Sequence, residues 1–381
     1  MRTAVTDLLG IDVPILAFSH CRDVVAEVSR AGGLGVLGAV AHTPEALEID
    51  LNWIEEQVGD RPYGVDLIIP AKYAGDDQGG FTLDDIRQLI PAEHVAFVDD
   101  ILARYDVPPL PADDDDPGRA GWQTSGGDAP FSANRAGPQL DITLAHKASF
   151  VANALGPPPP EMIERVKAEG RVVAALAGRG VHAERHAAAG VDVIIAQGSE
   201  AGGHTGEIGS MVLIPEVVDA VAPLPVLGAG GIGRGRQMAA AMALGAQGVW
   251  CGSVWLTTAE AETHPTVKAK MLAATSADTL RSRSLTGKPA RMLRSAWTDE
   301  WADEDNPDPL GMPLQPILTA QAQYRINRAA ERNPGAEKLV NYFVGQVVGT
   351  MNTATTSRQV VFAMVEEFIE AVEGLAAQLE D

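Results

Sequence analysis

The sequence predicts a single (β/α)₈ barrel, and two observations lead to this fold class. Eight short apolar runs recur along the chain, and they are continuous in apolar character rather than alternating. Parallel strands that are buried on both faces require such runs. Between them lie amphipathic stretches, several of which end in glycine, a residue that commonly stops helices. Strand, helix and glycine in regular repetition is the pattern of a β/α barrel.

The expected strands share β-branched or small apolar residues and are closed by turn residues. They are residues 14–18, 35–40, 65–69, 150–155, 172–176, 191–196, 225–228 and 248–251. The expected helices between them include residues 23–30, 44–58, 160–168 and 236–244. Residues 140–146 are expected to form the third barrel helix, because they lead directly into the fourth strand.

Residues 70–138 interrupt this alternation of strands and helices. The segment contains the acidic run 113–116, many glycines and prolines, and one convincing helix at 92–105. We therefore expect an enlarged loop after the third strand. Loops that follow strands lie at the catalytic face of such barrels, so this insertion should border the mouth. It is either a lid or wall of the site or an acidic, solvated excursion without a role in chemistry.

The domain organisation follows from these assignments. Residues 1–275, insertion included, should form the barrel. Residues 276–381 should form a mostly helical C-terminal extension that ends in the amphipathic stretch 360–379 and packs on the outside of the barrel or caps it.

Composition and charge exclude several classes of function. The formal net charge is −22, from 51 acidic and 29 basic residues, and such a surface repels nucleic-acid backbones and anionic membranes. Cys21 and Cys251 lie far apart without metal-type spacing and are typical of reduced cytosolic thiols. We expect a cytoplasmic monomer or homodimer, with no metal, that binds a small molecule.

The most informative segment, AQGSEAGGHTG at 196–206, begins where the sixth strand ends. Paired glycines such as Gly202 and Gly203 let the backbone pass close to a flat ligand. His204 beside them can exchange a proton near neutral pH. The alternative is a tight loop in which His204 binds a neighbouring carbonyl, but the dense glycines at a strand's carboxyl end favour a site.

A second glycine loop, GAGGIG at 228–233, follows the seventh strand. It matches G-x-G-x-x-G, but a dinucleotide site needs an acidic residue about 20 positions further on. Residues 248–255 contain none. Loops after the last two strands of a barrel commonly bind phosphate, with help from helix N-termini. Gly230 and Gly231 would provide the first such loop, and Gly252 and Ser253 the second.

A phosphate site beside a loop for a flat ligand suggests FMN, with its ring reaching toward Ala17, Phe18 and Ser19 at the end of the first strand. Physical reasoning alone leaves other phosphate-bearing ligands open.

The segment 196–206 resembles the AQGxEAGGHxG motif of the nitronate monooxygenase family, formerly called 2-nitropropane dioxygenases, which are FMN-dependent barrels. AGGLGVLG at 31–38, the loop at 225–232 and GKPARMLR at 287–294 are similar to further segments of that family. The resemblance implies an oxidoreductase that uses FMN and O₂ to convert alkyl nitronates to a carbonyl compound and nitrite. Neutral nitroalkanes would be substrates too, with His204 as the base.

The same resemblance implies the residues that contact FMN. They are Ala17, Phe18, Ser19, Asp66, Gln197, Gly202, Gly203, Gly230, Gly231, Gly252 and Ser253. Asp66 stands where the family often has asparagine.

Three departures from the family pattern keep other functions open. LAFSH at 16–20 replaces a QAPM-like strand, GSVW at 252–255 lacks the arginine of a GTRF segment, and the insertion has no firm counterpart. The main alternative is an FMN-dependent reductase that uses NAD(P)H to reduce an enoyl thioester or a quinone. The acidic insertion disfavours a large anionic substrate. A non-enzymatic FMN-binding protein is the third possibility.

Overall fold

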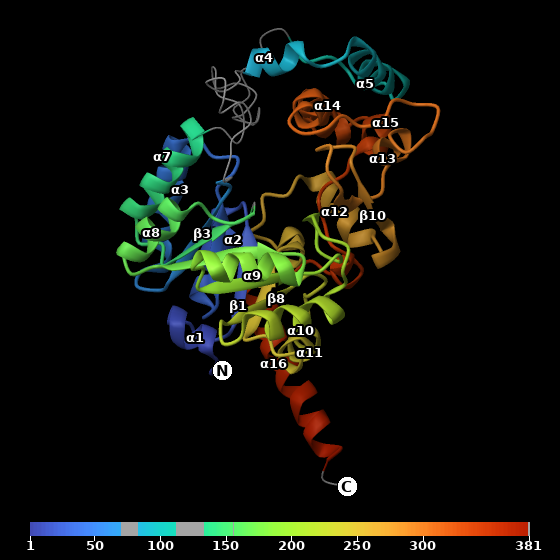
Figure 1. Cartoon of the computed structure of the whole chain (residues 1–381). Coiled ribbons are helices and arrows are strands. Elements are labelled where there is room, and N and C mark those ends of the chain that lie inside the picture. Colours follow the sequence, from blue (N-terminus) through green and yellow to red (C-terminus); the bar gives the residue numbers. More distant parts are fainter. Residues whose placement is uncertain (70–82, 112–132, 155, 380–381) are drawn as a thin grey trace.

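The computed structural model describes residues 1–69, 83–111, 133–154 and 156–379, and its centre is a closed barrel of eight parallel strands (Figure 1). The (β/α)₈ prediction is confirmed. The strands are β1 (Ile15–Ser19), β2 (Leu34–Gly38), β3 (Tyr63–Leu67), β4 (Phe150–Asn153), β5 (Val172–Ala177), β6 (Val193–Gln197), β8 (Val226–Ala229) and β9 (Gly248–Cys251). Each lies within about two residues of an expected run, because a strand buried on both faces has an unmistakable apolar pattern.

Both faces of the strands are indeed buried. Side chains such as Leu16, Val36 and Ile195 fill the barrel interior. The alternate residues, such as Ile15 and Val151, pack outward against the helices. This alternation decides which polar residue at a strand's end reaches the barrel mouth.

Helices surround the barrel in the expected order. They are α2 (Arg22–Arg30), α3 (Pro44–Val58), α7 (Ala133–Ala145), α8 (Pro160–Ala168), α9 (Gly180–Ala189), α10 (Ser210–Val221) and α11 (Gly235–Ala243). The short α1 (Ala4–Leu9) lies at the amino-terminal end of the barrel (Figure 1). The third barrel helix, expected at 140–146, is the second half of α7, which packs against α3 and β3.

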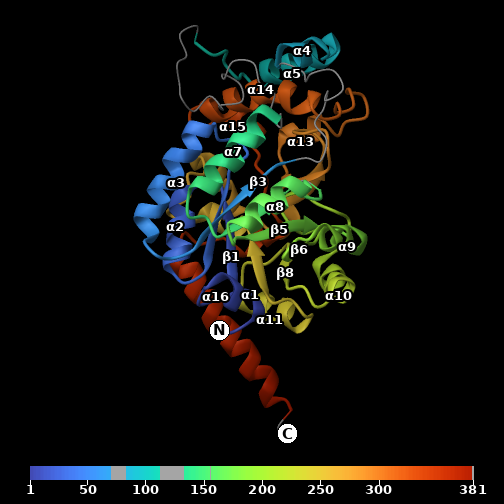
Figure 2. The ribbon, with the colours of Figure 1, turned by 60° about the vertical axis from the view of Figure 1, so that its left-hand side comes forward.

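The eighth position in the helical layer is taken by α16 (Ser357–Ala377), near the end of the chain. It packs against α11 on one side and α2 on the other, and buries Val360, Val361 and Met364. A β-carbon on Gly235 of α11 would lie 2.1 Å from the Met364 carbonyl oxygen, so only glycine permits this close approach. The second half of α16 projects beyond the barrel (Figure 2). The expected domain boundary at residue 275 remains a prediction.

The insertion and the C-terminal extension together form a helical unit on the side of the barrel opposite α1 (Figures 1 and 2). It contains α4 (Leu83–Gln88), α5 (Ala92–Arg104), α13 (Ala296–Glu300), α14 (Leu314–Ala330) and α15 (Pro334–Leu339). The expected helix at 92–105 is thus α5. Phe97 meets Trp301 edge to face, with ring centroids 4.9 Å apart. The insertion therefore shares a core with the extension. The acidic run 113–116 lies outside the described residues.

The extension is mostly helical but also contains two strands, β10 (Thr279–Ser282) and β11 (Ala290–Leu293). They form an antiparallel sheet with β7 (Gly203–His204), the two-residue strand inside the glycine-rich segment after β6. The extension therefore reaches the loop that carries His204.

Candidate active site

The glycine-rich loop after β6 is held by the C-terminal extension. In the β7–β11 pair, His204 lies opposite Ala290 and Gly203 opposite Arg291. Arg291 donates to the carbonyl oxygen of Ser199 at 2.9 Å, and Arg281 to that of Thr205 at 3.0 Å. These bonds fix both ends of the loop and with them the position of His204.

His204 is bound through one ring nitrogen. Its Nε2 lies 2.8 Å from Oγ1 of Thr286, which in turn donates to the carbonyl oxygen of Lys288 at 3.1 Å. Its partner is thus a hydroxyl rather than the carbonyl of the alternative interpretation. The residue is exposed, but neighbouring protein atoms remove part of its hydration. This desolvation, followed by the charge of Lys288, lowers the pKa of His204. The imidazole is therefore neutral at neutral pH and can accept a proton.

Asp66 points into the barrel. It lies opposite Gly38 on β2 and Ala152 on β4, and Ala152 belongs to the interior cluster. It is 4% exposed, and within the described residues its Oδ1 has no hydrogen-bond partner. Burial raises the pKa of Asp66 to about 8. An unpaired buried carboxyl is costly and in a barrel mouth marks a candidate ligand contact.

The three residues expected at the end of β1 divide between the two faces of the strand. Phe18 points inward, and its ring stacks with Trp250 at a centroid distance of 5.9 Å. Ala17 faces the helices with no exposed surface, and the hydroxyl of Ser19 accepts from the amide of Cys21. Only main-chain atoms of Ala17 could reach a ligand in the mouth.

Gln197, Gly202 and Gly203 have different surroundings. Gln197 ends β6 opposite Ala229, a residue of the interior cluster, and its side-chain amide has no hydrogen bond among the described residues. A β-carbon on Gly202 would lie 2.8 Å from the backbone of Val344, so protein packing demands glycine there. Gly203, with φ of +77°, has nothing within 4 Å of its virtual β-carbon and borders open space.

The two expected phosphate loops offer main-chain donors. In the part of the chain that the structure describes, no hydrogen bond occupies the amides of Gly230, Gly231, Gly252 or Ser253. Gly230 and Gly231 have φ of +98° and +71°, conformations that favour glycine. Ser253 begins a 3₁₀ turn (Ser253–Thr257), and its hydroxyl accepts from the amide of Gly345 at 2.8 Å.

The N-terminus of α11, the helix after the first phosphate loop, is already capped by side chains. The amides of Gly233 and Arg234 donate to the side chain of Gln237. That of Gly235 donates to Glu367 on α16 at 3.0 Å. Since α11 is already capped, the amides left for an anion are those of Gly230 and Gly231 and those of Gly252 and Ser253 at the start of the 3₁₀ turn. A contribution from a helix N-terminus stays a prediction.

A cavity of about 330 Å³ adjoins the outer side of the Gly230–Gly231 loop. Its walls come from α10, α11 and the 3₁₀ turn Gln346–Thr350. Neither His204 nor Asp66 lines it. It therefore shares only the first phosphate loop with the predicted site and does not by itself define a place for a flat ring.

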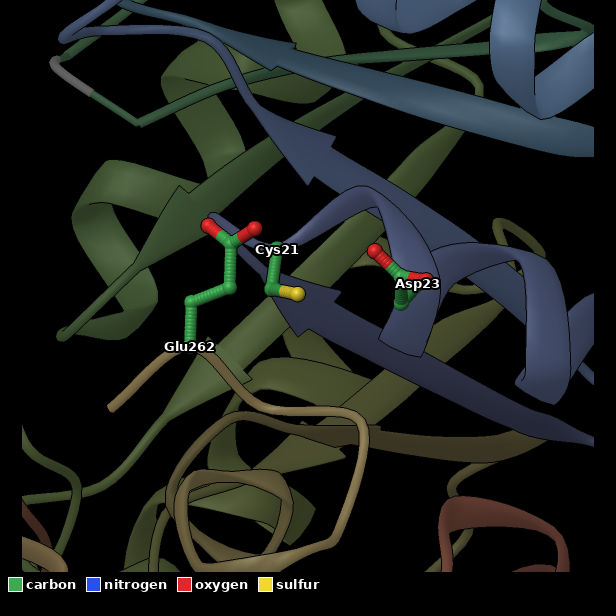
Figure 3. Close-up of side chains that lie close together, drawn as sticks. All are labelled: Cys21, Asp23 and Glu262. Carbon is green, nitrogen blue, oxygen red and sulfur yellow. The ribbon is translucent and has the colours of Figure 1, made fainter. Parts of the chain in front are cut away.

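Cys21, Asp23 and Glu262 bring their potential ligand atoms within 4.8 Å of one another (Figure 3). The Cys21 thiol donates to the carbonyl oxygen of Glu260 at 3.0 Å, and burial raises its pKa. The Cys21 thiol already has a hydrogen-bond partner, and exposed carboxylates often lie close together without an ion, so we assign no metal site to this group.

Comparison with known proteins decides the family. The model of the family described as nitronate monooxygenase matches residues 2–367. The chain belongs to the nitronate monooxygenase family. The resemblance of the motif at 196–206 is thereby confirmed. Within the described residues, no helix is both long and apolar enough to cross a membrane.

Three known proteins are similar to this family member over almost the whole length of both chains. A Mycobacterium tuberculosis protein named "Putative monooxygenase Rv1533" is 61% identical over 98% of both chains. The nitroalkane oxidase of Streptomyces ansochromogenes has a TM-score of 0.78 and 26% identity, covering 98% of this chain and 100% of its own. FabK of Thermotoga maritima has a TM-score of 0.71 and 27% identity, covering 99% of both. The protein is an enzyme of the oxidoreductase class.

The sequence did not predict that Thr286, Arg281 and Arg291 of the C-terminal extension hold the loop that carries His204. The segment 287–294 was the available signal, since it resembles the family and adjoins Thr286. No local pattern shows that it pairs with residues more than 80 positions earlier.

Proposed function

We propose that the protein is an FMN-dependent nitronate monooxygenase. It would use O₂ to convert alkyl nitronates to a carbonyl compound and nitrite, and would accept neutral nitroalkanes after removing a proton. The observation that carries this proposal is a histidine that Thr286 holds through Nε2 on the glycine-rich loop at the carboxyl end of β6, with its pKa lowered by desolvation. The family match and the structural likeness to a nitroalkane oxidase support it.

The residues present are suited to FMN. The amides of Gly230, Gly231, Gly252 and Ser253 could bind its phosphate, since backbone donors stabilise anions without a lysine. Asp66, Gln197, Phe18 and the open side of Gly203 would face the ring, and Ala17, Ser19 and Gly202 would contribute main-chain contacts. When bound, FMN supplies the electron-transfer chemistry, which protein side chains lack.

The orphan Oδ1 of Asp66 is the strongest sign that a ligand completes the mouth. With its raised pKa, the carboxyl is protonated at pH 7 and can donate a hydrogen bond to an acceptor on the ring. A family asparagine at this position would also offer a donor. The aspartate therefore preserves the hydrogen-bonding capacity as long as it stays neutral.

The imidazole of His204 acts on the substrate. Its low pKa keeps it unprotonated at neutral pH, so it can take the proton from the carbon beside the nitro group. Preformed nitronates have already lost this proton and need only binding and orientation. The two substrate forms should therefore differ in their dependence on His204.

The second candidate is an FMN-dependent reductase of an enoyl thioester or quinone that takes electrons from NAD(P)H. The likeness to FabK, with 27% identity over 99% of both chains, favours it to a lesser degree. In this case His204 would orient or protonate an unsaturated substrate.

One experiment separates the two candidates. Oxygen consumption by the purified, FMN-loaded protein is measured with propionate 3-nitronate, and oxidation of NADH or NADPH is followed under the same conditions. We expect rapid oxygen uptake and nitrite release with the nitronate, and no turnover of the nicotinamides. Rapid NAD(P)H oxidation with an enoyl thioester or quinone, without nitronate turnover, would refute the monooxygenase proposal.

A further inference from the structure

We infer that Thr286 is a positioning residue that keeps His204 in the tautomer protonated on Nε2, so that Nδ1 is the atom that accepts the substrate proton. The inference rests on the proposed function, because it specifies which nitrogen of the proposed base reacts.

Nε2 of His204, the hydroxyl of Thr286 and the carbonyl oxygen of Lys288 form a short hydrogen-bonded chain. The hydroxyl of Thr286 has a single proton, and the carbonyl oxygen of Lys288, 3.1 Å away, can only accept it. Oγ1 therefore offers a lone pair to the ring nitrogen 2.8 Å away on its other side. Both contacts are satisfied at once only if Nε2 of His204 carries a proton and donates it to Oγ1. In a neutral imidazole the free lone pair is then on Nδ1.

The surroundings of His204 keep the ring neutral as well as oriented. The charge that acts on it is that of Lys288, which lowers the pKa of His204 together with desolvation. Phe343, with its ring centroid 6.4 Å away, contributes an apolar neighbour. Among the described residues no carboxylate binds the ring. A hydroxyl can fix the tautomer without the charge that would raise the basicity and favour the imidazolium form.

The backbone holds the hydroxyl of Thr286 in a fixed position relative to the His204 ring. His204 is paired with Ala290 of β11, and Thr286 and Lys288 lie in the connection between β10 and β11. Thr286 and the base are thus attached to the same three-stranded sheet. The hydroxyl of Thr286 therefore remains within hydrogen-bond distance of Nε2, although 82 positions separate the two residues.

The proton transfer is balanced without any redox partner. The bond between hydrogen and the carbon beside the nitro group breaks, and the proton goes to Nδ1. The electron pair of that bond forms the C=N bond of the nitronate, and the negative charge moves to the nitro oxygens. The imidazolium that results still donates from Nε2 to Thr286.

The test compares Thr286→Val, which removes the hydroxyl while keeping the shape, with Thr286→Ser, which retains it. In the FMN-loaded full chain labelled with ¹⁵N-histidine, two-bond ¹⁵N–¹H spectra identify the tautomer. His204→Asn assigns the resonance among the 8 histidines. We expect a proton on Nε2 in the wild type and in Thr286→Ser, and a mixture of tautomers in Thr286→Val.

Activity provides the second readout. In Thr286→Val we expect kcat/KM for neutral nitroalkanes to fall about tenfold, which is part of the typical contribution of a general base. The rate with preformed nitronate should fall much less, the flavin should be retained, and Thr286→Ser should restore the nitroalkane rate. An Nδ1–H tautomer in the wild type, or unchanged tautomer and rate in Thr286→Val, would overturn the role of Thr286. A wild type inert toward both substrate forms but protonated on Nε2 would refute the proposed function instead, so the two failures are distinguishable.

Discussion

The guanidinium of Arg104 binds the carboxylate of Glu300 through two parallel hydrogen bonds, each 2.7 Å long. The hydroxyl of Tyr105 donates to the same carboxylate at 3.0 Å. Arg104 belongs to the insertion after β3, whereas Glu300 ends α13 in the C-terminal extension. This bidentate pair joins two segments almost 200 positions apart into one helical unit beside the barrel.

Breaking this link should loosen the helical unit and leave the barrel intact. In Glu300→Ala, Arg104 and Tyr105 lose a common partner. Arg104 is 45% exposed, so we expect a loss of only about 1 kcal/mol, smaller at high ionic strength. Hydrogen exchange should quicken in α5 and α13. Arg2→Ala, which breaks an exposed ion pair with Asp7, is the control. Equal protection of α5 in the wild type and Glu300→Ala would contradict the prediction.

Substituting Gly231 should remove the flavin. In Gly231→Leu the side chain would project from a loop whose φ is +71°, and its β-carbon would lie 3.1 Å from that of Glu200. The amides proposed for the phosphate would be displaced, so we expect colourless protein after desalting. Released flavin in the wild type should be FMN.

The control for backbone strain is Gly10→Leu. Gly10 has a similar φ of +67°, lies at the end of α1, and has nothing within 4 Å of its virtual β-carbon. This variant should lose stability but keep its flavin. A folded Gly231→Leu protein with full FMN content would exclude Gly231 from the phosphate site.

Asp66 should make the flavin-free protein less stable as the pH rises. Its pKa is about 8 in the folded state, against about 4 for an ordinary aspartate. Between these values the folded state binds more protons than the unfolded state. Stability therefore falls with increasing pH, by at most about 1.4 kcal/mol per pH unit, and levels off above pH 8.

Asp66→Asn removes this titration and is the comparison. Urea unfolding of both flavin-free proteins from about pH 5 to 9 should show the variant gaining relative stability with pH. Parallel curves would mean that the Asp66 carboxyl ionises normally. Bound flavin should widen the pH range of the difference, because a ring acceptor that binds the protonated carboxyl would raise the pKa of Asp66 further.

His204→Asn should separate the two substrate forms. General-base catalysis is typically worth about 10²–10⁴-fold, so activity on neutral nitroalkanes should fall by that order, with a much smaller loss on preformed nitronates. Flavin content should be retained, since glycine amides rather than the imidazole would hold the cofactor. Steady-state oxygen consumption with each form measures this. Equal losses on both forms would indicate a binding or structural role.

The pH profile tests the same residue in the wild type. Because the pKa of His204 is lowered, the neutral base should persist below the usual histidine value of about 6.5. The kcat/KM for neutral nitroalkanes should therefore be constant above this value and fall only at lower pH. A midpoint above it would contradict a desolvated, neutral His204.

The sequence predicts most of the barrel, because each strand and helix is encoded in a short stretch of chain. A strand covered on both faces needs an uninterrupted apolar run, and α3 and α8 begin at prolines suited to a first helical turn. The glycines at 202–203 and 230–231 can likewise be recognised as candidate ligand loops from the local sequence alone. They mark places where the backbone must turn or pass close to another group.

The contacts between distant segments follow from the three-dimensional fold and from no local pattern. The strands, most of the barrel helices and the histidine loop can be predicted from the sequence, since periodicity and glycine placement depend on neighbouring residues. Periodicity alone does not show that Glu367 caps α11, that α16 completes the helical layer, or that Thr286 binds His204. Each of these contacts depends on how the closed barrel brings the end of the chain back to its middle. The unpaired Oδ1 of Asp66 has the same origin, because strand register turns the carboxyl toward the barrel interior, where no described residue forms a hydrogen bond with this atom.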